Sequence, residues 1–65
     1  MTPRTDHLID LYKKRGTPYE EVLREMVDGG YRPTEIGWVL WHVFGLSMPD
    51  AVHRATVAIA EREDE

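Results

Sequence analysis

The spacing of its prolines constrains the fold of this 65-residue chain more than any other sequence feature. Intervals of 15, 15 and 16 residues separate Pro3, Pro18, Pro33 and Pro49. Proline is favoured in the first turn of an α-helix, where its missing N–H group costs nothing, and it disrupts a helix interior. The spacing therefore predicts four short helices, near residues 5–15, 18–28, 33–44 and 48–62.

Residues that start and stop helices lie at matching positions. Thr17, followed by Pro18 and Glu20, predicts a capping box, and the stretch 47–50 predicts a similar cap with aspartate in place of glutamate. Glycines at positions 16, 29, 30 and 45 are expected to end helices in the left-handed conformation. We therefore predict an all-α, compact four-helix single domain over residues 1–65.

Composition narrows the possible functions. The chain has no cysteine, which excludes disulfides and thiolate sites and fits a reducing cytoplasm. Its formal net charge is −4, and residues 33–65 hold two basic and six acidic side chains, so this half would repel phosphate. The apolar run 36–46 is shorter than the roughly 20 residues of a membrane span, and no signal-peptide pattern is seen. A cytoplasmic protein is expected, with residues 61–65 frayed because their acidic groups oppose the helix dipole.

The predicted third helix has two opposed apolar faces. One arc of about 140° contains five core candidates, which are Ile36, Val39, Leu40, Val43 and Phe44. Trp38 and Trp41 project almost opposite to this arc, flanked by Thr34 and Gly45. Each of the other predicted helices has a single apolar stripe, so three short helices would have to cover both faces.

Two interpretations of the tryptophans follow. In the first, the first or fourth helix covers them and they complete the core. In the second, they stay partly exposed and form the centre of a contact with another protein or a second copy, since tryptophan is enriched at binding hot spots. We favour a protein-interaction module, either a homodimer, an adaptor or an inhibitor. Its predicted contact residues are Trp38, Trp41, Thr34, Gly45 and His42.

The stretch 30–55, GYRPTEIGWVLWHVFGLSMPDAVHRA, carries a recognisable pattern of Pro33, Glu35, an aliphatic core, FGLS at 44–47 and Ala51. It resembles the helical hairpin in the C-terminal domain of the bacterial ribosomal stalk protein. The resemblance implies a tight helix-Gly-Leu-helix hairpin. In that family a lysine that helps to engage translation factors typically follows the alanine, whereas this chain has Val52.

A DNA-binding alternative uses the same segment. Residues 35–37, 45–47 and 51–54 resemble a helix-turn-helix unit whose second helix enters the major groove, although the first of its helices is about one turn too long. The basic residues available to this alternative are Arg54, His53, Lys13, Lys14 and Arg15. They are few beside the acidic C-terminal half, so nucleic-acid binding is disfavoured.

Catalytic and metal sites have little support in the sequence. The carboxylates fall on expected solvated faces or helix caps, and Ser47 is explained as an N-cap. The spacing of His7, His42 and His53 matches no ligand motif. We therefore predict no enzymatic activity, no metal and no cofactor.

Overall fold

The computed structural model describes residues 3–63, which form four α-helices joined by short loops. The helices are α1 (Pro3–Arg15), α2 (Tyr19–Asp28), α3 (Pro33–Phe44) and α4 (Met48–Glu63). Each lies within two residues of its predicted bounds, and no strand occurs between residues 3 and 63. The all-α, single-domain prediction is confirmed. None of the described helices combines the length and the apolar character that a membrane span needs.

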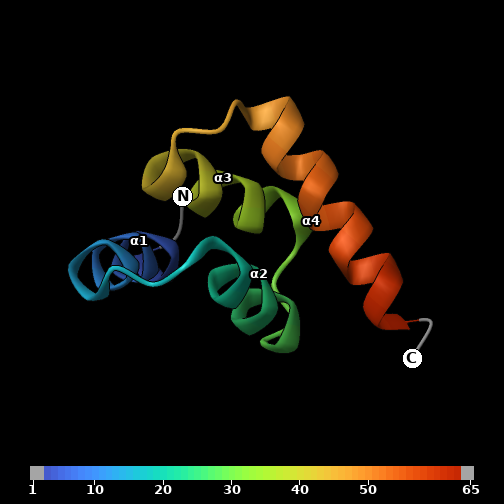
Figure 1. The fold of residues 1–65 in the computed structure, drawn as a ribbon, viewed down its shortest axis with the longest axis horizontal. Helices are drawn as coiled ribbons and strands as arrows, with labels where there is room; N and C mark the ends of the chain where they lie inside the picture. Colours follow the sequence, from blue (N-terminus) through green and yellow to red (C-terminus); the bar gives the residue numbers. More distant parts are fainter. Residues whose placement is uncertain (1–2, 64–65) are drawn as a thin grey trace.

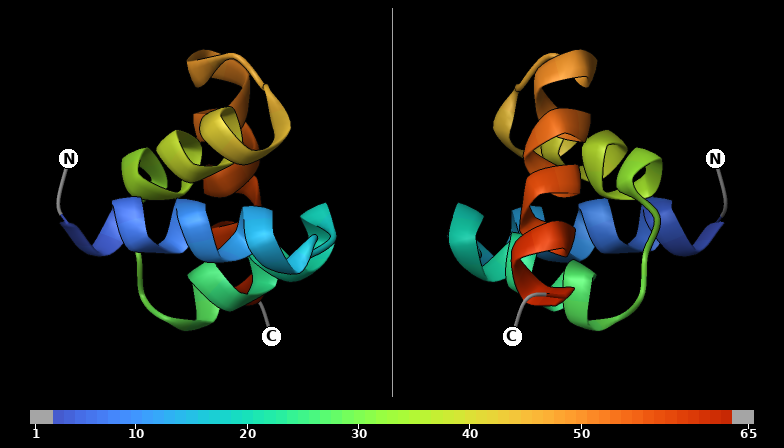
Figure 2. Two further views of the ribbon diagram at one scale, coloured as in Figure 1. Left: turned by 90° about the vertical axis from the view of Figure 1, so that its left-hand side faces the viewer. Right: turned by 90° about the vertical axis from the view of Figure 1, so that its right-hand side faces the viewer.

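Helix α3 is the central element of the fold. It contacts each of the other three helices, and α4 crosses it and continues past it to lie beside α2 (Figures 1 and 2). Helix α1 packs along another side of α3. Helices α1, α2 and α4 therefore cover part of the surface of α3. This agrees with its apolar sequence, which favours burial.

The core is formed by one face of each helix. Of the predicted core arc of α3, Ile36, Val39 and Leu40 are completely buried, while Val43 and Phe44 are half-buried. The other helices contribute Tyr12 from α1, Val22 and Met26 from α2, and Ala51 and Ala55 from α4. Burial raises the pKa of the Tyr12 phenol above its ordinary value.

Helices α3 and α4 approach each other closely because small residues face across their contact. A Cβ atom built on Gly37 would lie 2.7 Å from Cγ2 of Val52 and 3.2 Å from its backbone nitrogen. Ala51 and Ala55, on the facing helix, are fully buried. The small residues of α4 and Gly37 on the α3 side together make this close approach possible.

The helix ends match the sequence in most places. Gly16, Gly30 and Gly45 adopt positive φ, as predicted for helix C-caps, whereas Gly29 does not, with φ at −78°. Gly29 keeps a right-handed helical conformation, and the left-handed turn occurs one residue later, at Gly30. The prediction of a left-handed Gly29 is wrong.

The predicted capping box at Thr17 is also wrong. Pro18 is in an extended conformation, so the helix begins after it and Pro18 itself is the N-cap, without a side-chain cap bond. Thr17 therefore lies too far from the helix and is buried instead. The cap at Ser47 is confirmed, since the backbone N–H of Asp50 donates to Ser47 Oγ at 3.4 Å.

At the other end of the chain, α4 remains helical through Glu63, and Arg62 forms an ion pair with Asp28 of α2. The rest of the predicted fraying segment, residues 64 and 65, lies outside the described residues. Fraying of residues 61–65 stays a prediction.

Candidate partner-binding face

Trp38, Trp41 and His42 form a cluster on α3, and we refer to these three residues as the aromatic cluster. Their spacing of three and four residues places the side chains next to one another on a helix. The two indole centroids are 5.1 Å apart with the rings at 83°, an edge-to-face arrangement. The His42 ring lies 4.5 Å from Trp38 and 4.7 Å from Trp41. The cluster is thus held together by contacts within one helix.

No neighbouring helix seals the aromatic cluster from solvent. Trp41 is 41% exposed, His42 is exposed and Trp38 is half-buried. The Trp38 indole N–H is itself buried and has no hydrogen-bond acceptor among the described residues. An unsatisfied buried donor costs about 1–3 kcal/mol. The cluster therefore combines accessible apolar surface with an unused donor.

Thr34 and Gly45 lie at the two ends of α3. Thr34 is exposed in the first turn, and Gly45 is exposed just after the last. The Gly45 N–H donates to the Trp41 carbonyl at 2.9 Å and its positive φ ends the helix there. All five predicted contact residues consequently belong to α3 or its C-cap, and only Trp38 among them is not exposed.

The residues of the DNA-binding alternative lie in two separate places. Lys13, Lys14 and Arg15 are exposed in the last turn of α1, whereas His53 and Arg54 line a groove between α2 and α4. The three α1 cations do not line that groove. The structure therefore does not gather the five residues into one basic surface.

Arg54 is already engaged within the chain. Its Nε donates to Asp50 Oδ2 at 3.1 Å, and its guanidinium carbon lies 5.9 Å from the centre of the Tyr19 ring. Tyr19, and after it Asp50, raise the pKa of Arg54 above its ordinary value. The charge of Arg54, the arginine that the DNA-binding alternative places on its second helix, is thus partly balanced within the chain.

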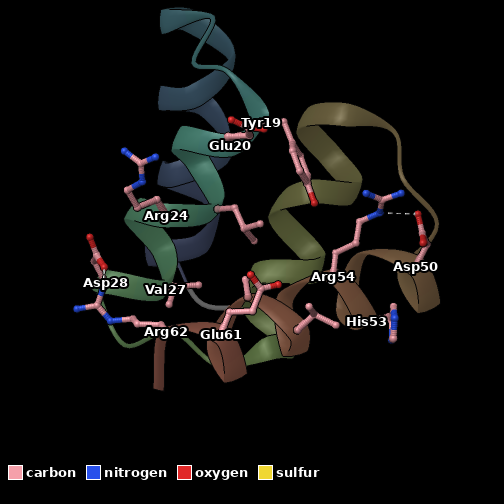
Figure 3. Close-up of a pocket in the computed structure, with 13 residues that line it drawn as sticks. Tyr19, Glu20, Arg24, Val27, Asp28, Asp50, His53, Arg54, Glu61 and Arg62 are labelled. Carbon is pink, nitrogen blue, oxygen red and sulfur yellow. Dashed lines mark hydrogen bonds and ion pairs between the residues drawn. The ribbon is translucent and has the colours of Figure 1, made fainter. Parts of the chain in front are cut away.

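The groove between α2 and α4 was not predicted from the sequence. It has a volume of about 660 Å³ (Figure 3), and its apolar lining residues include Leu23, Val27, Val57 and Ala58. Val57 is 41% exposed, and Trp41 is the only other large hydrophobic side chain among the described residues that is exposed to this extent. Charged side chains of both signs also line the groove. A sequence signal was available in Glu20, Arg24 and Asp28, which recur every four residues along α2.

Neither surface has the features of a metal centre, since the described residues contain no group of three or more side chains able to hold a metal ion. The aromatic cluster is instead an accessible apolar spot on the most buried helix of the fold. Comparison with known proteins adds no family to this description: no protein-family model, curated protein or solved structure matches the chain.

Proposed function

We propose that this chain is a small protein-interaction module whose contact is centred on the aromatic cluster. The observation that carries the proposal is the 41% exposure of Trp41 beside a half-buried Trp38. Exposed tryptophan is costly in water and is among the residues most enriched at binding hot spots. A protein surface that covers the cluster would bury both indoles together.

The partner is either a second copy of the chain or a different protein, for which this chain would act as an adaptor or inhibitor. Its surface would be apolar at the centre, to match the two indole rings. A hydrogen-bond acceptor beside the Trp38 indole would also satisfy the donor that has no partner within the described residues. We place this function in the cytoplasm and propose no catalytic role.

Replacement of Trp41 by alanine tests the proposal. Trp41→Ala should weaken association by about tenfold or more, because a hot-spot side chain is lost. It should lower the free energy of unfolding only slightly, since the side chain is already 41% exposed. Association is measured by light scattering for self-association, and by the retention of co-purifying partners from the native host.

Val57→Ala is a matched control, because Val57 is equally exposed but does not belong to α3. It should leave binding to the aromatic cluster unchanged. If Trp41→Ala lowers stability as strongly as it lowers association, the tryptophans have a plain core role and the proposal fails.

The DNA-binding alternative makes a separate prediction. Retention on DNA would be salt-sensitive and abolished by Arg54→Ala, because phosphate contacts release counterions. We favour it less, because Arg54 pairs with Asp50 and lies far along the chain from the α1 cations.

A further inference from the structure

The helices that border the α2/α4 groove carry most of the acidic residues of the chain. Helices α2 and α4 together have seven acidic side chains and three arginines, whereas α1 has two acidic and four basic side chains. Two of the three arginines are paired within the chain, Arg54 with Asp50 and Arg62 with Asp28. Within the described residues, the charges of α2 and α4 that enter no ion pair are therefore five glutamates and Arg24.

The groove itself combines this negative charge with apolar surface. Glu20 lines it from α2 and Glu61 from α4, and both side chains are exposed. Among the described residues, Arg24 is the one lining arginine outside the two ion pairs. Apolar side chains of both helices also line the groove, and Val57 is 41% exposed there. An occupant of this groove therefore has to match exposed apolar surface and a net negative charge.

Two helix faces form the groove. Every lining residue belongs to α2 or α4, and along each helix the lining residues return every three or four positions. Such a stripe is the kind of surface against which the apolar stripe of another helix packs. Glu20, Arg24 and Glu61 are exposed, so the groove does not enclose a small ligand as a typical ligand pocket does. A further helix is therefore the occupant that this surface favours.

The charge of the groove selects among possible helical partners. A twofold contact with a second copy would bring two acidic faces together, and like charges repel. Nucleic acid would be repelled for the same reason, because its backbone is negatively charged. A basic helix would instead be attracted to Glu20 and Glu61, since the guanidinium groups of Arg54 and Arg62 already pair with carboxylates of this chain.

We propose that the α2/α4 groove binds an amphipathic helix of another protein, one whose apolar stripe is flanked by lysine or arginine. The apolar stripe covers Val57 and the other apolar lining residues, and the flanking cations interact with Glu20 and Glu61. This mode of recognition, in which a helix lays its apolar face into a groove, is common among protein complexes. The site is separate from the one in the proposed function, because no residue of the aromatic cluster lines the groove.

Synthetic peptides test the chemistry of the partner. The probe is a labelled peptide of about 14 residues, or roughly four helical turns, with leucines three and four residues apart and lysines beside them. Fluorescence anisotropy against increasing concentrations of the chain gives its Kd. A peptide with glutamate in place of every lysine should bind at least about tenfold more weakly, because it is repelled by the groove. A peptide with proline at its centre should also bind at least about tenfold more weakly, because proline disrupts the helix.

Variants of the chain locate the site. Val57→Asp should weaken binding of the lysine peptide about tenfold although it makes the chain more acidic, because a buried charge would replace apolar contact. Glu20→Gln combined with Glu61→Gln should weaken binding about fivefold at low salt, since two exposed charge contacts are lost. Thermal melts check that each variant folds.

Two controls keep the charge and the aromatic surface apart from the groove. Glu21→Gln combined with Glu25→Gln makes the same change in net charge at exposed sites of α2 that do not line the groove, so it should change the Kd less than about twofold. Trp41→Ala removes the exposed indole of the aromatic cluster and should leave binding of the peptide unchanged.

Several results would overturn the proposal. The lysine peptide might bind no better than its glutamate or proline counterpart, or the Glu21 and Glu25 substitutions could weaken binding as much as those at Glu20 and Glu61. Self-association by light scattering that Val57→Asp abolishes would assign the groove to a second copy instead.

Binding that Trp41→Ala abolishes and Val57→Asp leaves intact would also overturn the groove site, but it would support the proposed function at the aromatic cluster. Conversely, a groove that binds the peptide leaves the association test of Trp41→Ala as it stands. Failure of one proposal is therefore distinguishable from failure of the other.

Discussion

Helix α4 meets α3 and α2 in two different ways. Against α3 it is so close that a Cβ atom on Gly37 would overlap Val52, and Ala51 and Ala55 of α4 are fully buried. Against α2 it leaves a groove of about 660 Å³, crossed at one end by the ion pair between Arg62 and Asp28. One helix therefore takes part in a packed core on one side and in an open surface on the other.

The difference shows how side-chain size decides whether two helices pack or only border a groove. Glycine and alanine let the α3 and α4 backbones approach, so that many atoms come within the short range of dispersion forces. Long charged side chains line the α2 and α4 sides of the groove and keep their charged groups in water. Helix α2 is instead attached to the core by its opposite side, through Val22 and Met26.

The largest expected effect distinguishes the core from the groove between α2 and α4. Met26→Ala should lower the free energy of unfolding by about 2–5 kcal/mol, because it opens a cavity in a fully buried site. Val57→Ala, in the groove, should cost less than about 1 kcal/mol, because 41% of that side chain is already exposed. Urea denaturation of both variants, under conditions where the chain is monomeric, measures the difference. Equal losses would mean that the groove is as tightly packed as the core.

A smaller loss is expected at the contact between α3 and α4. Gly37→Ala adds a methyl group against Val52, and such overpacking costs about 1–3 kcal/mol, while the higher helix propensity of alanine returns about 1 kcal/mol. We expect a net loss of about 1 kcal/mol in the free energy of unfolding.

Combining Gly37→Ala with Val52→Ala removes the nearest atom and should make the glycine substitution less harmful than it is in the wild-type background. Ala58→Leu is the matched enlargement in the groove and should cost less, because that half-buried site borders the groove and not the packed core. A stabilising Gly37→Ala would show that the two backbones are further apart than described.

The smallest expected effect concerns the ion pair that closes the groove. Its side chains are 54% exposed for Arg62 and 46% for Asp28, so the pair should contribute about 0.2–1 kcal/mol. Arg62→Ala should lower the melting temperature slightly at low salt, and the difference from wild type should narrow near 1 M salt, where charges are screened. A difference that does not change with salt would assign the effect to lost packing of the arginine stem instead.

Local sequence signals were sufficient for the helices. Prolines and glycines act on the backbone within one turn, so they predicted four helices whose ends lie within two residues of those observed. The same holds for the core arc of α3, because burial follows directly from apolar periodicity. The failures at Thr17 and Gly29 are also local, since a shift of one residue in a helix end changes which side chain or glycine serves as the cap.

The two candidate surfaces differ in the same way: one could be predicted from local sequence and the other could not. The aromatic cluster was recognised from the sequence because its members share one helix face, although the sequence left open whether a neighbour would cover it. The α2/α4 groove was not recognised, because its walls come from helices that residues 29–47 separate in the sequence. No local sequence pattern indicates how far apart helices α2 and α4 lie.

By itself, the sequence determined the bounds of each helix to within two residues, which face of α3 is buried and that two tryptophans lie opposite that face. Only the tertiary structure decided that α4 packs tightly on α3 through Gly37, that it stands apart from α2 and that Trp41 stays exposed. The physical reason is one of range. Helix formation depends on contacts within about four residues along the chain, whereas the spacing of helices depends on which side chains from distant segments meet.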